Sequence, residues 1–152
     1  MKNKLVYANF NAETGISDVV IKNKNGTFMG VATCHPEEEH VSEYAGCRYA
    51  EIRANIKAVQ YEKRMVNAAI KELEDFEKIL KSLKGYNPNS IEARRLRRRI
   101  HEKKEERIFL QTAIIAMKNT LKRVMDERDE LIKKHSTLKD VMKDQYHKNK
   151  SE

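Results

Sequence analysis

Two long segments of this chain carry apolar residues at steps of three and four, the spacing that places side chains on one face of a helix. The pattern predicts a first helix over about 42–83 and a second over about 90–135, each with a stripe at coiled-coil spacing. The apolar positions are Ile52, Ile56, Val59, Val66, Ile70, Leu73, Phe76, Leu80 and Leu83 in the first segment, and Leu96, Ile100, Leu110, Ile114, Met117, Leu121, Val124 and Leu131 in the second.

A short polar connection over 84–90 separates the two segments. Gly85 suits the left-handed position that follows a helix, and Pro88 cannot continue one. Asn89, with Glu92 three residues later, is expected to form a capping box at the start of the second helix. So short a connection makes neighbouring helices antiparallel, which predicts a helical hairpin.

The N-terminal part of the chain has a strand pattern instead. Asn25-Gly26 lies between two apolar, β-branched runs and predicts a β-hairpin over about 17–33. Residues 1–15 are poorly patterned, although LVYANF could form a short strand. We expect Val20 and Val31 to be buried against Tyr44 and Ile52, as a small core between the hairpin and the first helix.

These elements define an α+β fold that is mostly α: an N-terminal β-hairpin packed on a long antiparallel helical hairpin. The predicted organisation is an N-terminal segment over 1–41, the helical hairpin over 42–135, and a C-terminal helix or tail over 136–152. Within that last segment, the pattern favours a short helix from Leu138 to about His147.

The composition agrees with the predicted fold and restricts the class of protein to which the chain can belong. Charged residues make up 36% of the chain and aromatic residues 7%, which suits a protein of long helices. No apolar run is long enough for a membrane span, and the N-terminus has no signal-peptide core. Cys34 and Cys47 are too few for a disulfide framework. We therefore expect an intracellular protein that does not insert into a membrane.

Charge is distributed unevenly and points to an anionic partner. Residues 84–152 carry nineteen Lys and Arg against eleven Asp and Glu, which accounts for the whole net charge of +8. Arginines are densest at the start of the second helix, beside Tyr86, whose ring could stack on a base. Four of the arginines cover about half of the helix circumference, and Arg97 falls between Leu96 and Ile100. The predicted interface consists of Tyr86, Arg94, Arg95, Arg97, Arg98, Arg99, Lys103 and Lys104.

Like charges at this spacing repel one another, so a solvated helix gains nothing from such density. The cluster therefore predicts contact with nucleic-acid phosphates or with an acidic protein surface.

A second group of reactive residue types surrounds Pro36. Cys34, His35, His40 and Cys47 could in principle bind zinc, but only the histidine pair has a spacing typical of such sites. We favour a packed corner with no metal and no cofactor. The acidic run 37–39 is better explained as charge that complements a helix N-terminus than as a metal site. No nucleophile with an orienting partner is visible, so we expect a protein that is not an enzyme.

Residues 26–54 read GTFMGVATCHPEEEHVSEYAGCRYAEIRA, in which Cys34-His35-Pro36 precedes acidic residues and a helix start that contains Gly46. This segment resembles a motif of small uncharacterised proteins from Firmicutes phages and prophages. The similarity extends over about 16–125 and includes the turn after the first helix. The matching residues are Gly30, Ala32, Cys34, His35, Pro36, Glu38, Ser42, Glu43, Gly46, Ala50, Arg53 and Ala54, followed by Asn87, Pro88, Ser90, Arg98 and Ile100. The resemblance implies a phage accessory protein in the cytoplasm of a bacterial host, and such proteins often counter host defences.

Three functional hypotheses follow from these observations. The first is a non-enzymatic inhibitor of a host defence system, of the anti-CRISPR type, which binds an RNA-guided nuclease or its nucleic acid through the basic helix and turn. The second is a general nucleic-acid-binding phage accessory protein or a coiled-coil adaptor. The third is a metal-dependent enzyme built on the Cys/His corner. A homodimer could form through the second helix or the C-terminal tail.

Overall fold

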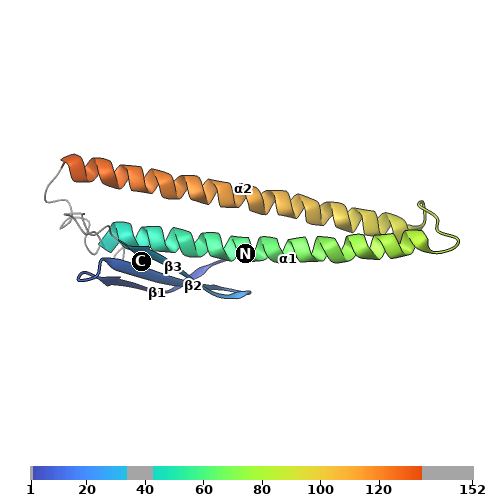
Figure 1. The fold of residues 1–152 in the computed structure, drawn as a ribbon, viewed down its shortest axis with the longest axis horizontal. Coiled ribbons are helices and arrows are strands. Elements are labelled where there is room, and N and C mark those ends of the chain that lie inside the picture. The colour runs from blue at the N-terminus through green and yellow to red at the C-terminus, as the bar shows by residue number, and fades with distance from the viewer. Residues whose placement is uncertain (1, 34–42, 135–152) are drawn as a thin grey trace. The chain divides into compact units, whose positions relative to one another are not determined.

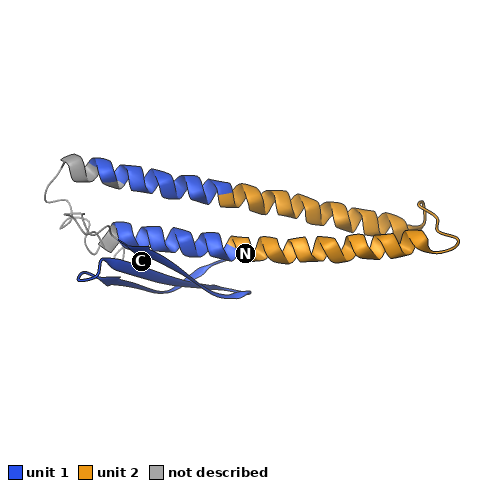
Figure 2. Cartoon of the chain, in the orientation of Figure 1, with its two compact units in different colours: residues 1–58, 115–152 blue, residues 59–114 orange. Residues whose placement is uncertain are grey.

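The computed structural model describes residues 2–33 and 43–134, which form three strands followed by two long helices (Figure 1). The elements are β1 (Lys4–Asn11), β2 (Ile16–Asn23), β3 (Gly26–Thr33), α1 (Glu43–Ser82) and α2 (Ile91–Lys134). The described residues divide into two compact units (Figure 2). Unit 1 contains the strands, α1 up to Ala58 and α2 from Ile115, and unit 2 contains residues 59–114. The predicted C-terminal helix lies outside the described residues.

The β-hairpin is confirmed, and a third strand extends it. The sheet is antiparallel with the order β1-β2-β3, so the short strand considered for residues 5–10 is a full member of eight residues. The turn between β2 and β3 is centred one residue earlier than Asn25-Gly26, because Asn23 pairs with Gly26. The Asn23 side chain accepts a hydrogen bond from the Asn25 backbone N–H at 2.8 Å, which fixes that tight turn.

The sheet of unit 1 buries the opposite face from the one we expected. Val19 and Ile21 on β2 are buried, together with Ala32 on β3, whereas Val31 is 37% exposed. Successive side chains of a strand point to opposite faces, so burying Val19 and Ile21 turns Val20 and Val31 outward. The expectation that Val20 and Val31 form the core was therefore wrong by one position on each strand. Ile52 does pack against this core, as expected, whereas the side chain of Tyr44 lies outside the described part of the structure.

Small residues allow the sheet and α1 to approach very closely. A Cβ atom on Gly30 would collide with the backbone of α1 at Ala50 and Ala54, and one on Gly46 would collide with the Ser17 side chain. Ala50 and Ala54 are themselves fully buried. The sheet and α1 are therefore closely packed in the core of unit 1, and this contact requires residues with little or no side chain.

Two basic side chains of α1 complete this interface at the sheet edge. Arg53 donates a hydrogen bond to the Val31 carbonyl and Lys57 donates one to the Met29 carbonyl, each at 2.8 Å. These carbonyls belong to β3, which is an edge strand. Part of that edge is thus closed by α1, which limits its ability to pair with another chain.

The C-terminal part of α2 adds the remaining layer of unit 1. Val124 is buried in the same core as Val19 and Ala50, and the partly buried Leu121 packs against it. The Tyr49 hydroxyl donates a hydrogen bond to the Val124 carbonyl at 3.4 Å. Within unit 1, α1 therefore lies between the sheet and α2 (Figure 1).

Unit 2 is the turn end of the helical hairpin, as the sequence predicted. α1 ends at Ser82, and Gly85 adopts a φ of 84°. The predicted cap was wrong, because Ser90 rather than Asn89 caps α2: its hydroxyl accepts the Ala93 backbone N–H at 3.2 Å. The Asn87 side chain instead accepts the Asn89 N–H at 2.9 Å and shapes the turn.

The helices of unit 2 share a small core. Val66 and Ile70 from α1 meet Leu110 from α2, with Val59 packed beside them. The Lys63 ammonium group donates a hydrogen bond to the Gln111 side chain across the same interface. Within the described ranges, neither helix contains the long uncharged apolar stretch that crossing a membrane requires.

Candidate anion-binding interface

The arginine cluster, which we define as Arg94, Arg95, Arg97, Arg98 and Arg99, occupies the first turns of α2 directly after its N-terminal cap. Ser90 fixes this start twice, since its hydroxyl accepts the Ala93 N–H and its carbonyl accepts the Arg94 N–H at 3.0 Å. The backbone under the cluster is therefore regular helix from the first residue, and the spacing of the guanidinium groups follows from helix geometry.

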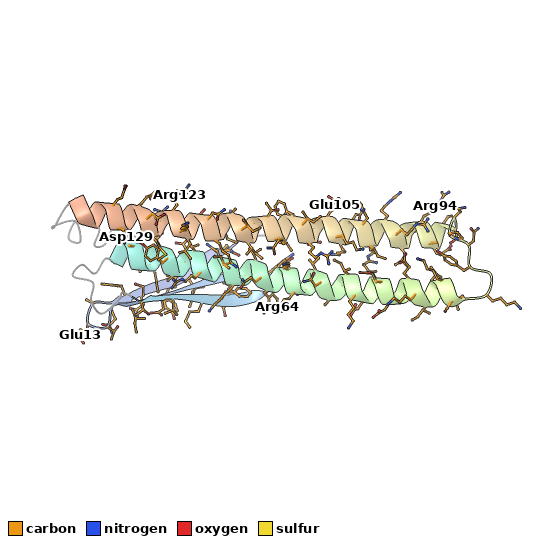
Figure 3. All side chains as sticks on the ribbon, turned by 45° about the horizontal axis from the view of Figure 1, so that its top comes forward. Glu13, Arg64, Arg94, Glu105, Arg123 and Asp129 are labelled. Atoms are coloured by element: carbon orange, nitrogen blue, oxygen red, sulfur yellow. The ribbon has the colours of Figure 1, made fainter. Side chains whose placement is uncertain are left out.

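Every side chain of the cluster is exposed, while its helical neighbours are buried. Ala93, Leu96 and Ile100 are 2%, 8% and 7% exposed. At about 100° per residue, the five arginines span roughly 200° of the circumference, on both sides of this narrow buried stripe. Arg97, which we expected to lie apart from the other four, shares the exposed surface with them. The labelled Arg94 side chain extends outward from α2 in Figure 3.

Within the part of the chain that the structure describes, no guanidinium group of the cluster makes a hydrogen bond or ion pair. The acidic residues of the following turns are partly engaged elsewhere. Glu105 lies 3.5 Å from His101, and Glu106 lies 3.3 Å from Lys103. The ion pairs described along α2 therefore leave the guanidinium groups of the cluster unengaged.

The flanking residues of the predicted interface are less available than the arginines. Lys103 and Lys104 are half-buried, and Lys103 is held by Glu106. Tyr86 in the turn is also half-buried. The accessible cationic surface is thus the five arginines themselves, whose planar groups can each bind a phosphate or carboxylate through two hydrogen bonds.

The second candidate site is described only in part. Cys34, His35, His40 and the acidic run 37–39 lie outside the described residues, so their arrangement stays a prediction. Cys47 is fully buried in the core of unit 1. Among the described residues, no three His, Cys, Asp or Glu side chains gather closely enough to hold a metal ion.

Sequence reasoning missed a second apolar surface on α1. Phe76 and Leu83, which we assigned to the stripe that packs inside the hairpin, are 55% and 56% exposed. Met65 and Ile79 are exposed to a similar extent, at 48% and 60%. The signal was present in the sequence as a second set of three- and four-residue steps, which overlaps the buried stripe in an apolar-rich helix.

The predicted dimer surfaces are also only partly described. On α2, Ile108 and Phe109 are 63% and 71% exposed, whereas the C-terminal tail lies outside the described residues. A homodimer through either surface stays a prediction.

Comparison of the chain with protein-family models, with curated proteins and with solved structures finds no match.

Proposed function

We propose that this chain is a non-enzymatic binding protein whose arginine cluster contacts the phosphates of a nucleic acid, either free or within a ribonucleoprotein. The observation that carries the proposal is five exposed guanidinium groups without a partner among the described residues, over a wide arc of one helix. Placing these like charges together disfavours the isolated protein, and an anionic partner removes that repulsion.

The width of the arc favours nucleic acid over an acidic protein. A helix that lies on a flat charged surface contacts it with one narrow face, whereas a helix in a groove meets phosphates on both walls. The major groove of a DNA duplex is about 12 Å wide and admits an α-helix. An arc of roughly 200° suits the second arrangement, because guanidinium groups on both flanks can reach a phosphate.

The resemblance to prophage proteins supports a biological setting for this binding. In that setting the protein occupies the nucleic acid of a host defence machine, such as the guide or target strand of an RNA-guided nuclease, in the bacterial cytoplasm. Inhibition of this kind needs no chemical step, only occupation of phosphates that the nuclease uses.

Salt-dependent binding to short RNA and DNA probes tests the proposal. Each neutralised phosphate should contribute about −0.9 to the slope of log K against log salt on duplex, and about −0.7 on a single strand. The variant Arg94→Gln/Arg95→Gln/Arg98→Gln/Arg99→Gln should keep its helix content, since Gln and Arg have similar helix propensities. We expect it to lose most of its affinity and to flatten the slope by up to about 3.6 units on duplex and about 2.8 units on a single strand.

A matched control removes the same charge from elsewhere. Lys22, Lys24, Lys118 and Lys122 are all exposed and lie in unit 1, so changing them to Gln gives an equal loss of net charge. We expect this control to bind nearly as tightly as the parent. Equal weakening in both variants would show that only net charge matters, and a parent that binds none of the probes would reject the proposal.

One observation favours an acidic protein as the partner instead. Ile91 is 62% exposed and lies one turn before Arg94 and Arg95, on the same side of α2. A phosphate-binding surface has no use for an exposed isoleucine, whereas a protein interface combines apolar anchors with arginines. Ile91→Ser should leave binding to the nucleic-acid probes unchanged if phosphates are the target.

A further inference from the structure

The part of α1 in unit 2 carries two apolar stripes, of which only one is used inside the hairpin. The second stripe, which we call the outer seam, follows alternating steps of four and three without interruption. Its positions are Met65, Ala69, Glu72, Phe76, Ile79 and Leu83. Five of the six are apolar, and this period is the mark of a helix that packs against another helix along its length.

The outer seam is exposed in the single chain. Its four large apolar side chains are between 48% and 60% exposed, at positions well separated around the helix from the buried Val66 and Ile70. At about 200 Å² for a large side chain, they offer roughly 400 Å² of apolar surface per copy. Two copies together approach the roughly 1,200 Å² that specific interfaces bury, once the flanking residues are counted.

We propose that the outer seam pairs with the outer seam of a second copy of this chain, in antiparallel orientation. In this pairing, a two-fold axis passes near residue 74 of each copy. Each residue therefore faces the residue of the second copy whose number, added to its own, gives 148. Ala69 then faces Ile79 of the second copy, a small residue against a large one, and Met65 faces Leu83. Glu72 faces Phe76, so that its aliphatic stem covers the ring while its carboxylate reaches the rim.

The charge pattern favours antiparallel over parallel pairing. In parallel pairing, the arginine clusters of the two copies lie at the same height along the bundle and repel. Antiparallel pairing places them at different heights. The residues directly beside the seam are also compatible with close approach, since Ala68 and Ser82 are small and exposed and Asp75 is the acid between them. Lys71 and Lys78 lie further out, within reach of Asp75 and Glu72 of the other copy.

Analytical ultracentrifugation of the full chain, from low micromolar to near-millimolar concentration, tests the pairing. We expect the parent to dimerise and Phe76→Glu to stay monomeric, with at least a tenfold weaker association and unchanged helix content. Phe109→Glu is the matched control, because Phe109 is even more exposed but lies on α2. It should dimerise like the parent. Glu72→Leu should tighten the dimer by removing the polar member of the seam.

Cysteine cross-linking tests the register. In a Cys34→Ser background, where the remaining Cys47 is fully buried, Ala69→Cys mixed with Ile79→Cys should form a disulfide-linked pair. Neither variant should cross-link with itself, because two copies of position 69 lie roughly 15 Å apart along the axis.

Three results would overturn the proposal. These are a parent that stays monomeric at all concentrations, loss of the dimer in Phe109→Glu instead of Phe76→Glu, and self-cross-linking of Ala69→Cys, which indicates parallel pairing. All of these readouts are independent of nucleic-acid binding.

Discussion

The two units differ in how many neighbouring elements cover α1. Unit 1 covers α1 with a sheet and with α2, and its core contains ten buried residues, among them Ala50 and Ala54, which leave no room for another atom. Unit 2 has one helix packed on one helix, and its described core cluster joins Val66 and Ile70 of α1 to Leu110 of α2, while Ala93, Leu96 and Ile100 are also buried on α2. A helix with a single neighbour can bury only one stripe, so the rest of its surface is available to partners.

This contrast assigns different roles to the two units. Close backbone packing makes unit 1 intolerant of added volume, which is the property of a scaffold. Unit 2 carries the arginine cluster and the outer seam, both exposed and neither with any structural task inside the hairpin. We therefore expect substitutions in the core of unit 1 to affect stability, and surface substitutions in unit 2 to affect binding and association.

The largest expected effect is a loss of folding stability, tested by comparing two valines on adjacent strands of the sheet. Val19 is fully buried and Val31 is 37% exposed. Val19→Asp should destabilise the fold by about 3–5 kcal/mol, because its carboxylate has no partner in the core. Val31→Asp should lower the stability of the fold by only about 1 kcal/mol, mostly because the new carboxylate lies opposite Asp18 on β2 and the two like charges repel. Urea unfolding followed by circular dichroism measures both. Equal losses would mean that the sheet does not bury the face described here.

The comparison also shows what the sequence could predict. The helical stripes and the Asn-Gly signal predicted the hairpin of helices and the β-hairpin, because both signals are local. The buried face of β2 could not be chosen, since Val19, Val20 and Ile21 are all β-branched and show no alternation. The close contact of Gly30 with Ala50 joins positions twenty residues apart and leaves no local signal. The exposure of the arginine cluster was predictable, because charged residues flank a narrow apolar stripe.

Six of the residues on which the resemblance in the sequence analysis rests have packing roles in unit 1: Gly30, Ala32, Gly46, Ala50, Arg53 and Ala54. Ala32, Ala50 and Ala54 are buried, the two glycines permit close approach, and Arg53 closes the edge of β3. In this chain, these six residues therefore join the sheet to α1.

An intermediate effect on stability is expected when two isoleucines of α1 within unit 2 are compared. Ile70 is 3% exposed and Ile79 is 60% exposed. Ile70→Ala should cost about 2–4 kcal/mol by leaving a cavity in a core with few other members. Ile79→Ala should cost at most about 0.5 kcal/mol in dilute, monomeric protein. Hydrogen exchange of the amides of residues 59–82 reports the difference locally. If the two variants exchange alike, the inner and outer stripes of α1 are not distinct.

The smallest expected effect concerns the start of α2 and separates two adjacent cap candidates. The Ser90 hydroxyl accepts the Ala93 N–H, whereas the backbone N–H of Asn89 donates to Asn87 and its side chain makes no hydrogen bond among the described residues. Ser90→Ala should therefore destabilise the first turn of α2 by about 1 kcal/mol, the usual cost of losing an N-cap. Asn89→Ala should leave that turn unchanged. Because the cap holds the helix that presents Arg94 and Arg95, Ser90→Ala should also increase amide exchange at residues 93–95. A larger effect from Asn89→Ala would contradict the Ser90 cap. It would indicate instead that Asn89 forms the capping box with Glu92, and that the helix begins one residue closer to the turn.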